Sequence, residues 1–474
     1  MKRTSVTHLM RTTTFVLSIL VCAGSLCSKA YAQAWLPDRK YTEGPGIRVG
    51  DLEIHPGVAV RTGWDSNVFR SDGHERTPRV SSGLLAVTPH LNLSTLGALR
   101  KAEGEGASAN DVMAMPKIAF NAGVAGTYFQ YFKEAARPNG VNIGVDVDSL
   151  LKIMPLRPVS LDLGMGYQRT VQPFTERAPS GNYAASFFTP TARLNVGSKS
   201  KVLTSYVAYA PVITYYERKA TGFKDLNNAN HAIQVGSAWK FLPHTALLFD
   251  GEFDLHNYIK DVESLDPGDV AVLVSNGKRL IARLGINGAI TQKLSLRLMA
   301  GYGAMLLDRA VMSDYENAVG EGVLGYRFGV AHQFDIGYIG NVTPSYIGGW
   351  MRVDRGFARV KFSFARVFSL GLEAGGGYAT YGRALKVAPV GSTAPAVALG
   401  EDGDTNRKDV RVDGAVRTEY RITNWLAVMA DFTTFANLTN FKYATVAETT
   451  GGVPVPDPAR FIDFQVYGGV RAFY

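Results

Sequence analysis

The sequence predicts an all-β fold, a transmembrane antiparallel β-barrel of about 18 strands. Three observations predict it. Apolar and polar residues alternate with a period of two along many segments, the connections between those segments alternate between short and long, and the last segment is amphipathic and aromatic at its end. A strand sends alternate side chains to opposite faces, whereas a helix would scatter them around its circumference.

The composition limits the alternatives. The chain has 474 residues, of which 46% are hydrophobic and 11% aromatic, so it is too apolar to be disordered. Beyond the first 32 residues no run of 18 or more apolar residues occurs, which excludes a helical membrane protein. Glycine is abundant, with 50 residues, and Leu, Glu and Lys do not dominate as they do in helix bundles and coiled coils.

The first 32 residues are predicted to be a secretory signal peptide. Lys2, Arg3 and Arg11 form a positively charged region. An apolar stretch follows from Phe15 to Leu26, and Ala30-Tyr31-Ala32 offers a cleavage site. Residues 33–53 are then expected to be a short periplasmic segment, and 54–474 the outer-membrane barrel. Both cysteines lie in the signal peptide, so the mature chain has no thiol for a nucleophile or a metal site.

The charge balance gives no reason to expect a nucleic-acid partner. The whole chain carries a formal charge of +9, but the signal peptide contributes four cations and no acids. The mature chain has 46 basic residues against 41 acidic ones, which is only mildly basic. It contains no basic run interleaved with aromatic residues and no zinc-finger, helix-turn-helix or RNA-recognition pattern.

The segments with period-2 alternation define the expected strands. From Ile462 to Tyr474, apolar and polar residues alternate almost without a break. Between 409 and 422 the residues Val410, Val412 and Val416 share one face, while every charge lies on the other. Eighteen such segments, with 16 as the lower bound, begin near residues 54, 80, 117, 139, 157, 185, 201, 227, 244, 277, 293, 320, 335, 356, 369, 406, 425 and 461.

The connections between these segments predict how the barrel is oriented. Short ones lie near 155, 197–198, 242–243, 291–292, 368 and 423–424, and longer polar ones at 171–184, 217–227, 259–277, 307–319, 383–406 and 441–460. In outer-membrane barrels the short turns face the periplasm, so we expect the N- and C-termini of the chain there. A long connection at 96–116 is expected to be a periplasmic turn. Tyr467, Phe473 and Tyr474 are predicted to form the insertion signal that the barrel assembly machinery recognises.

The charged face of the strands is predicted to line a water-filled lumen. An 18-stranded barrel leaves an aqueous interior, and so many charges cannot be buried without water. Opposite signs are expected to face one another near 250–254 and 278–297. Whether these charges form a track for a substrate or only solvate the lumen stays open. The candidates for the pore lining are Arg279, Arg283, Arg297, Arg327, Arg359, Lys361, Arg411, Arg417, Asp250, Glu252 and Asp254.

No motif in the sequence points to catalysis. The eight histidines are scattered, with no HExxH and no paired metal-ligand spacing. His256 follows Asp254 on one face, but no G-x-S-x-G motif supplies a nucleophile. The acidic segment 401–404 lacks the full spacing of a calcium loop. We therefore expect no enzymatic activity, no cofactor and no metal.

The strongest family resemblance begins at the first strand. The run Trp64-Asp65-Ser66-Asn67-Val68-Phe69-Arg70 resembles a motif of the outer-membrane β-barrel porins that are often encoded with exopolysaccharide export systems. Trp64 replaces the Tyr that is usual in that family. The resemblance implies the outer-membrane pore of a polysaccharide secretion path, with a polysaccharide cargo and a periplasmic export component as partners. Asp65 and Asn67 also suit a tight turn from a strand into a loop.

Two other functions remain open from the sequence. The protein could be a general diffusion porin for small polar solutes, or a closed barrel whose loops serve as an adhesion or assembly platform. All of these functions place it in the cell outer membrane with lipid around it. An open conducting lumen would separate the two pores from the platform.

Overall fold

The computed structural model describes the chain over 46–73, 78–95, 117–137, 142–155, 157–171, 184–198, 200–217, 226–259, 271–272, 274–329, 331–365, 367–387, 397–398, 400, 405–445 and 455–474. The expected signal peptide, the expected turn at 96–116 and the acidic segment 401–404 lie outside these residues. Within them, no helix is long and apolar enough to cross a membrane, and the helical structure consists of one 3-10 turn, η1 (Glu134–Ala136).

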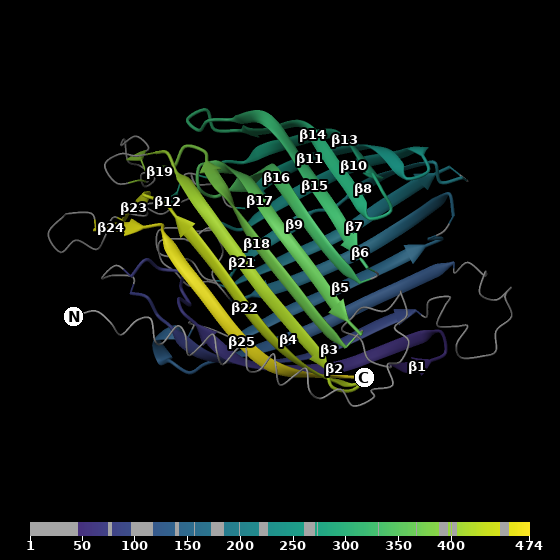
Figure 1. The fold of residues 1–474 in the computed structure, drawn as a ribbon. Helices are drawn as coiled ribbons and strands as arrows, with labels where there is room; N and C mark the ends of the chain where they lie inside the picture. Colours follow the sequence, from purple (N-terminus) through teal and green to yellow (C-terminus); the bar gives the residue numbers. More distant parts are fainter. Residues whose placement is uncertain are drawn as a thin grey trace.

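The wall of the molecule is one antiparallel sheet of eighteen strands that closes on itself (Figure 1). Closure occurs between the first wall strand, β2 (Leu52–Asp65), and the last, β25 (Phe461–Phe473). Their ladder runs from the pair Gly57 and Phe473 to the pair Asp65 and Gln465. A closed sheet has no unpaired edge, which allows it to cross lipid. The closure and the number of strands confirm the prediction from the sequence.

One wall strand consists of two halves. β8 (Leu203–Tyr209) and β9 (Val212–Tyr216) both pair with β7 (Ala185–Gly197) on one side and with β10 (Asn228–Leu242) on the other. The interruption falls at Pro211, which has no N–H to donate to a ladder.

The remaining elements follow the order of the chain. Before the wall, β1 (Ile47–Val49) forms a short hairpin with the beginning of β2. The other wall strands are β3 (Ser82–Thr95), β4 (Ile118–Tyr131), β5 (Ile143–Ile153), β6 (Val159–Thr170), β11 (Thr245–Tyr258), β13 (Gly277–Ala289), β14 (Leu294–Leu307), β15 (Tyr315–Phe328), β16 (His332–Ser345), β17 (Gly349–Phe364), β18 (Phe368–Tyr381), β21 (Lys408–Arg421) and β22 (Leu426–Leu438). Five short strands lie in the loops: β12 (Ala271–Val272), β19 (Leu385–Val387), β20 (Val397–Ala398), β23 (Lys442–Thr445) and β24 (Val455–Pro458).

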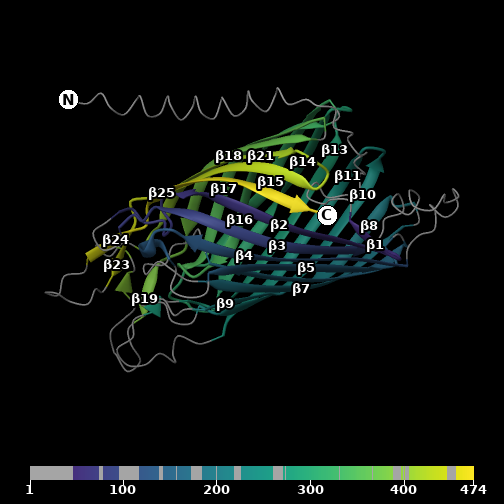
Figure 2. The same cartoon turned by 90° about the horizontal axis from the view of Figure 1, so that it is seen from below.

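Short turns and long loops lie at opposite ends of the barrel. The beginning of β2, the end of β25 and seven turns of two to five residues share one end, which we call the short-turn rim. The loop strands β12, β19, β23 and β24 gather at the other end, which Figures 1 and 2 show away from the C-terminus. One connection on the long-loop side, 346–348, has only three residues. The short turns are 154–158, 198–202, 243–244, 290–293, 329–331, 365–367 and 422–425.

The outer surface of the barrel is apolar. Large aliphatic and aromatic side chains project from alternate positions of the wall strands, such as Leu284 at 60% exposure, Val466 at 48% and Ile336 at 48%. The charged residues between them point to the inside. Such a surface suits lipid and not water, and every wall strand has a partner on both sides. The protein is therefore a membrane-spanning barrel of the outer-membrane type, and its location is the cell outer membrane.

Aromatic residues cluster toward the ends of the outer surface, as in the interfacial girdles of such barrels. Tyr302, Tyr326 and Tyr378 are exposed on this face. Further exposed aromatic residues near the short-turn rim are Trp239, Phe241 and Trp425. Their places at the ends of strands could have identified them from the sequence.

Candidate pore lining and constriction

The acidic and basic candidates of the pore lining lie on the inner face, beside one another. On β13, Arg279 and Arg283 alternate with the outward-facing Leu280 and Leu284. The neighbouring β11 places Asp254 directly opposite Arg279 and Asp250 directly opposite Arg283. Cross-strand partners of opposite charge are close enough to pair. The opposite signs expected from the sequence are thus brought together.

These neighbours form ion pairs, so the arginines are not free cations. The Arg279 guanidinium donates to Glu252 Oε1 at 2.6 Å and also to the Asp254 carboxylate. Arg283 Nε donates to Asp250 Oδ2 at 3.1 Å. Asp254 is fully buried and Arg279 nearly so. Charge on this stretch of wall is therefore largely compensated.

Further pairs continue around the inner face. Arg297 donates to Glu321 on β15, and Arg359 lies 3.3 Å from Glu373 on β18. Arg411 donates to the Tyr381 hydroxyl at 2.5 Å. In the part of the chain that the structure describes, the remaining candidates form no ion pair. These are Arg327, Lys361 and Arg417.

One central inner-face residue was missed by the sequence analysis. Arg355 on β17 donates to Asp413 at 2.9 Å and to Glu373 at 2.8 Å, and so joins β17, β18 and β21. The expected strand began near 356, which left Arg355 outside it. Arg355, Phe357 and Arg359 lie at every second position of β17, all facing inward, and this period of two is the signal that could have found Arg355.

Near the long-loop end, the hairpin of β16 and β17 leaves the wall and bends into the lumen. Its ladder with β15 ends at the pair Gly320 and Gly340, whereas β16 and β17 stay paired to Ser345 and Gly349. Arg279 Nη1, three strands away on β13, donates to the Val342 carbonyl at 3.1 Å. A bond from β13 to β16 that passes over two strands requires the hairpin to lie on the inner side of the wall.

Where the hairpin bends away from β15, hydrogen bonds from its side chains replace the backbone ladder between β15 and β16. Arg352 Nη1 donates to the Ala318 carbonyl of β15 at 2.9 Å, and Trp350 Nε1 donates to the Ser313 carbonyl at 2.7 Å. These bonds satisfy backbone groups that the ladder no longer reaches. At the tip, Gly348 and Gly349 both have positive φ, at 70° and 83°, which other residues rarely adopt.

The tip of this hairpin lies at the centre of an apolar cluster that crosses the lumen. Tyr346 and Ile347 are buried against residues from loops that follow β9, β11, β18 and β22. Around the wall, β10 and β22 are nine strands apart in a barrel of eighteen, so the cluster joins opposite walls. We call it the apolar plug. It consists of Leu226, Val274, Tyr346, Ile347, Ala379, Tyr381, Ala384, Phe441 and Ala459.

Two further contacts tie the loops together at the same end. A three-stranded sheet joins the loop after β11 to the loop after β18, with Ala271 paired to Val387 and Leu385 to Ala398. At the end of β6, Arg169 Nη2 donates to Glu217, which follows β9, at 2.6 Å, and this bond lowers the pKa of the Glu217 carboxyl. The long-loop end is thus held by both apolar and polar contacts.

The sequence motif after the first strand lies at the barrel seam. The Asn67 backbone N–H donates to Asp65 Oδ1 at 2.8 Å, which makes the tight strand-to-loop turn expected from these residue types. The Asn67 side chain donates to the Ser71 carbonyl at 2.7 Å and accepts from the Ser71 N–H at 2.9 Å. The loop is therefore closed by its own side chains.

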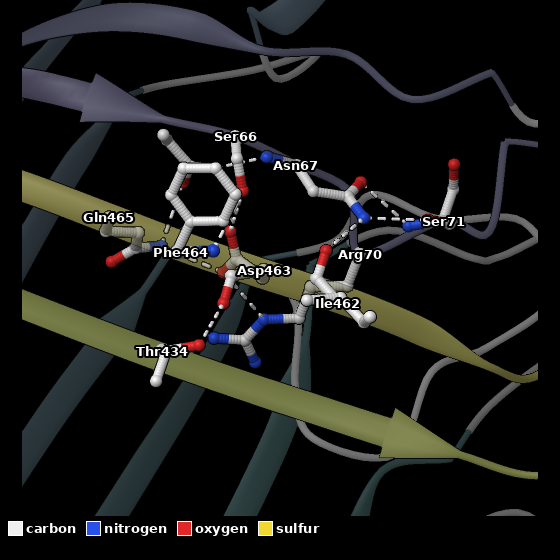
Figure 3. A network of polar contacts seen from close by, with 10 residues as sticks. Ser66, Asn67, Arg70, Ser71, Thr434, Ile462, Asp463, Phe464 and Gln465 are labelled. Atoms are coloured by element: carbon white, nitrogen blue, oxygen red, sulfur yellow. Dashed lines mark hydrogen bonds and ion pairs between the residues drawn. The ribbon is translucent and has the colours of Figure 1, made fainter. Parts of the chain in front are cut away.

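The same motif also holds the last strand. Asn67 Nδ2 donates to the Ile462 carbonyl at 3.0 Å, and Ser66 Oγ accepts from the Phe464 N–H at 2.8 Å (Figure 3). Arg70 Nε forms an ion pair with Asp463 Oδ2 at 3.6 Å. These contacts join residues nearly 400 positions apart, so the motif locks the point where the sheet closes.

The three residues of the expected insertion signal do not share a face. Tyr467 and Phe473 are at inward positions of β25, and Phe473 is buried beneath the Arg421 guanidinium, 4.8 Å from its ring centre. Tyr474 is exposed on the outer side.

Asp254 and His256, which share one face of β11, do not form a catalytic pair. Asp254 is bound by Arg279, and neither ring nitrogen of His256 has a hydrogen-bond partner among the residues that the structure places. His256 packs edge-on against Tyr258 instead.

No protein-family model and no curated protein matched the sequence. Among solved structures, the chain is similar to OccK11 (OpdR) of Pseudomonas aeruginosa, with a TM-score of 0.42 and 11% identity over 92% of this chain and 99% of that one. It is also similar to OpdQ of Pseudomonas aeruginosa, with a TM-score of 0.39 and 12% identity over 89% and 97%. The alcaligin outer-membrane receptor FauA of Bordetella pertussis gives 0.41 and 12% over 88% and 76%. The cargo of this chain has to be argued from its own residues.

Proposed function

We propose that the protein is an outer-membrane channel for a polar polymer, with its short turns and both chain termini toward the periplasm. The observation that supports this most is the combination of a charged inner wall and an apolar plug across it. An eighteen-stranded wall is wide enough for an aqueous lumen. Apart from Ala379 and Tyr381 at the end of β18, its plug is built from loops and one hairpin tip, elements that can move without opening the wall ladder. We infer a channel that is closed until the plug shifts.

We further propose that the cargo is an exopolysaccharide and that a periplasmic export component delivers it. The support is the resemblance of the run Trp64–Arg70 to the motif of porins encoded with such export systems. Polar side chains of both charges along the inner face suit a hydroxyl-rich chain, because they can donate and accept hydrogen bonds along its length.

The plug also bears on the two other functions. A general diffusion porin needs a permanently open lumen, which the plug opposes. A closed platform would keep the plug in place at all times, so this is the second candidate, and the plug itself favours it.

Conductance in planar bilayers separates these functions. The wild type is expected to show little conductance, and the double variant Tyr346→Gly, Ile347→Ser is expected to conduct steadily because the plug loses its central contacts. Ile290→Ser, in a turn at the opposite rim, is the control and should behave as the wild type. A well-folded double variant without conductance would favour the closed platform. Full conductance by the wild type would favour a diffusion porin.

A further inference from the structure

The inner wall contains a cavity at its short-turn rim. It has a volume of about 550 Å³ and extends along the wall from β5 to β14. Its size lies within the range of pockets that bind small ligands. Its lining combines apolar and polar groups, and its charged residues are mainly basic. The charged residues are Lys152, Arg157, Arg193, Lys201 and Arg297, together with Asp162 and Asp250.

Most of this positive charge has no carboxylate partner. Arg297 is paired with Glu321, and Asp250 is paired with Arg283, so these two lining residues are compensated. Across the described parts of the chain, Lys152, Arg157 and Lys201 form no ion pair. The cavity therefore holds a surplus of cations, in contrast to the paired wall around Arg279.

Arg193 is held rigidly at the centre of this surplus. Its guanidinium carbon lies 3.7 Å from the ring centre of Tyr206, which is stacking distance, and its Nε donates to Asn195 Oδ1 at 2.8 Å. Asp162 is its direct cross-strand neighbour, but the Asp162 carboxylate accepts from Asn195 at 3.1 Å. The Arg193 side chain stays exposed toward the lumen. A fixed guanidinium with free N–H groups is prepared to bind an anion.

The stacking depends on a glycine in the next strand. The Tyr206 ring packs against Gly236, where an added Cβ atom would lie 2.3 Å from the ring carbon Cε1. Any other residue at 236 would push the ring away from the wall. The platform is thus built in three layers from neighbouring strands, Gly236, Tyr206 and Arg193.

The basic character continues along the same rim. A second cavity of about 360 Å³ is lined by Lys240, Lys293 and Arg327, and its described lining residues include no Asp or Glu. We call these cations together the basic rim: Lys152, Arg157, Arg193, Lys201, Lys240, Lys293 and Arg327.

The geometry points to a binding site for the carboxylates of an acidic sugar chain at the Arg193 platform. An arginine fork binds a carboxylate bidentately, and the rim would concentrate polyanions at the mouth of the channel. Hydroxyl and amide groups of Ser160, Asn195 and Thr204 in the same cavity can bond sugar hydroxyls. The site faces the lumen and not the apolar belt, which argues against a lipid headgroup. The inference deepens the proposed function and rests on it for the route of the chain.

Binding can be measured apart from transport. We would titrate the refolded full-length barrel with tetragalacturonic acid and, for comparison, with neutral cellotetraose, by calorimetry. The acidic tetramer is expected to bind at least tenfold more tightly. Arg193→Gln should weaken it about tenfold, since a charged hydrogen-bond pair contributes about 1.5 kcal/mol or more. Tyr206→Leu removes the stacking platform and should weaken binding in the same direction. Arg61→Gln, at an inward position of β2, is the matched control and should bind as the wild type.

Each outcome decides one point. Equal affinity for the two tetramers, or equal losses in Arg193→Gln and Arg61→Gln, would overturn the site. Absence of acid binding by a barrel whose plug variant conducts would overturn the site and leave the channel in place. Acid binding that Arg193→Gln abolishes in a barrel that never conducts would support the site and reject the channel. Capture of an acidic periplasmic protein without any binding of the sugar would overturn the site in favour of a protein partner.

Discussion

The first and last strands of this barrel are joined by side chains as well as by the backbone ladder. Asp65, Asn67 and Ser71 are all nearly fully buried, although each is polar. Buried polar groups are tolerated when they are paired, and here the Asn67 amide uses both its donors and its acceptor. An amide is the side chain that can make this set of bonds, because it combines a carbonyl and an NH₂ group.

Removing the Asn67 amide is therefore expected to destabilise the seam. Asn67→Ala leaves the Ser71 N–H and the Ile462 carbonyl without that partner, at a cost of about 2 kcal/mol in the free energy of unfolding. Unfolding by urea in lipid vesicles measures it. Asn287→Ala, an exposed asparagine at an inward position of β13, is the control and should have little effect. Equal losses from both substitutions would show that Asn67 does not hold the seam.

The two faces of β13 give a second prediction at the scale of residues. Leu284 projects into the lipid belt, so Leu284→Arg should cost about 2–4 kcal/mol in unfolding free energy. Arg283→Leu removes a lumen cation beside Asp250 and should fold almost normally, because water can solvate that carboxylate. The same vesicle unfolding assay compares them. A larger loss for Arg283→Leu would mean that the faces are reversed.

Period-2 alternation was enough to predict faces from the sequence, because it needs only one strand at a time. It placed Arg279 and Arg283 inward and Leu284 outward, as found. It could not show that Asp254 and Asp250 stand directly opposite those arginines, since cross-strand register depends on turn length and bulges. Arg355 was missed because the expected strand began after it.

At the scale of elements, the β16–β17 hairpin carries the constriction, and Arg279 is its anchor. Arg279 and Arg283 both pair with acids on β11, but among these contacts only Arg279 also donates to the hairpin, at the Val342 carbonyl. The two arginines therefore offer a matched comparison on one strand.

Loss of the anchor should release the hairpin. Arg279→Gln is expected to raise the open probability of single channels several-fold, since the shorter neutral side chain no longer reaches Val342 from the acid pair. Arg283→Gln should leave the open probability near that of the wild type. Single-channel recording at fixed voltage is the measurement. The same change in both variants would assign the effect to lumen charge and not to the hairpin.

Wall strands were predictable in number and position, whereas the plug was not. Most expected strands begin within a few residues of the observed ones, since each spans the same apolar belt. The largest difference is at β17, which begins at Gly349 and not near 356, because its first residues follow the inward hairpin and lack the lipid-facing alternation. Tyr346 and Ile347 meet partners such as Leu226 and Phe441 across the lumen, and no local pattern encodes such contacts.

For the whole molecule, the inner surface divides into two electrical regions. The middle of the wall is compensated by pairs such as Arg283 with Asp250 and Arg297 with Glu321. The basic rim at the short-turn end has no such compensating acidic partners among the described ion pairs. Ion selectivity of an open lumen should therefore come mainly from the rim, which predicts a modest preference for anions.

Substitutions in the ion-paired middle of the inner wall should oppose this preference for anions. The substitutions Arg283→Gln and Arg297→Gln, made in the Tyr346→Gly, Ile347→Ser background so that current flows, leave Asp250 and Glu321 without their cations. The freed carboxylates attract cations, and the reversal potential across a KCl gradient should move toward cation selectivity. The shift should shrink as salt rises, since the Debye length falls from about 10 Å at 0.1 M to about 3 Å at 1 M. Lys408→Gln, which removes one cation at the long-loop end of β21, is the control and should shift the potential less than Arg283→Gln or Arg297→Gln alone. An unchanged reversal potential in the double arginine variant would mean that permeating ions do not pass along this part of the wall.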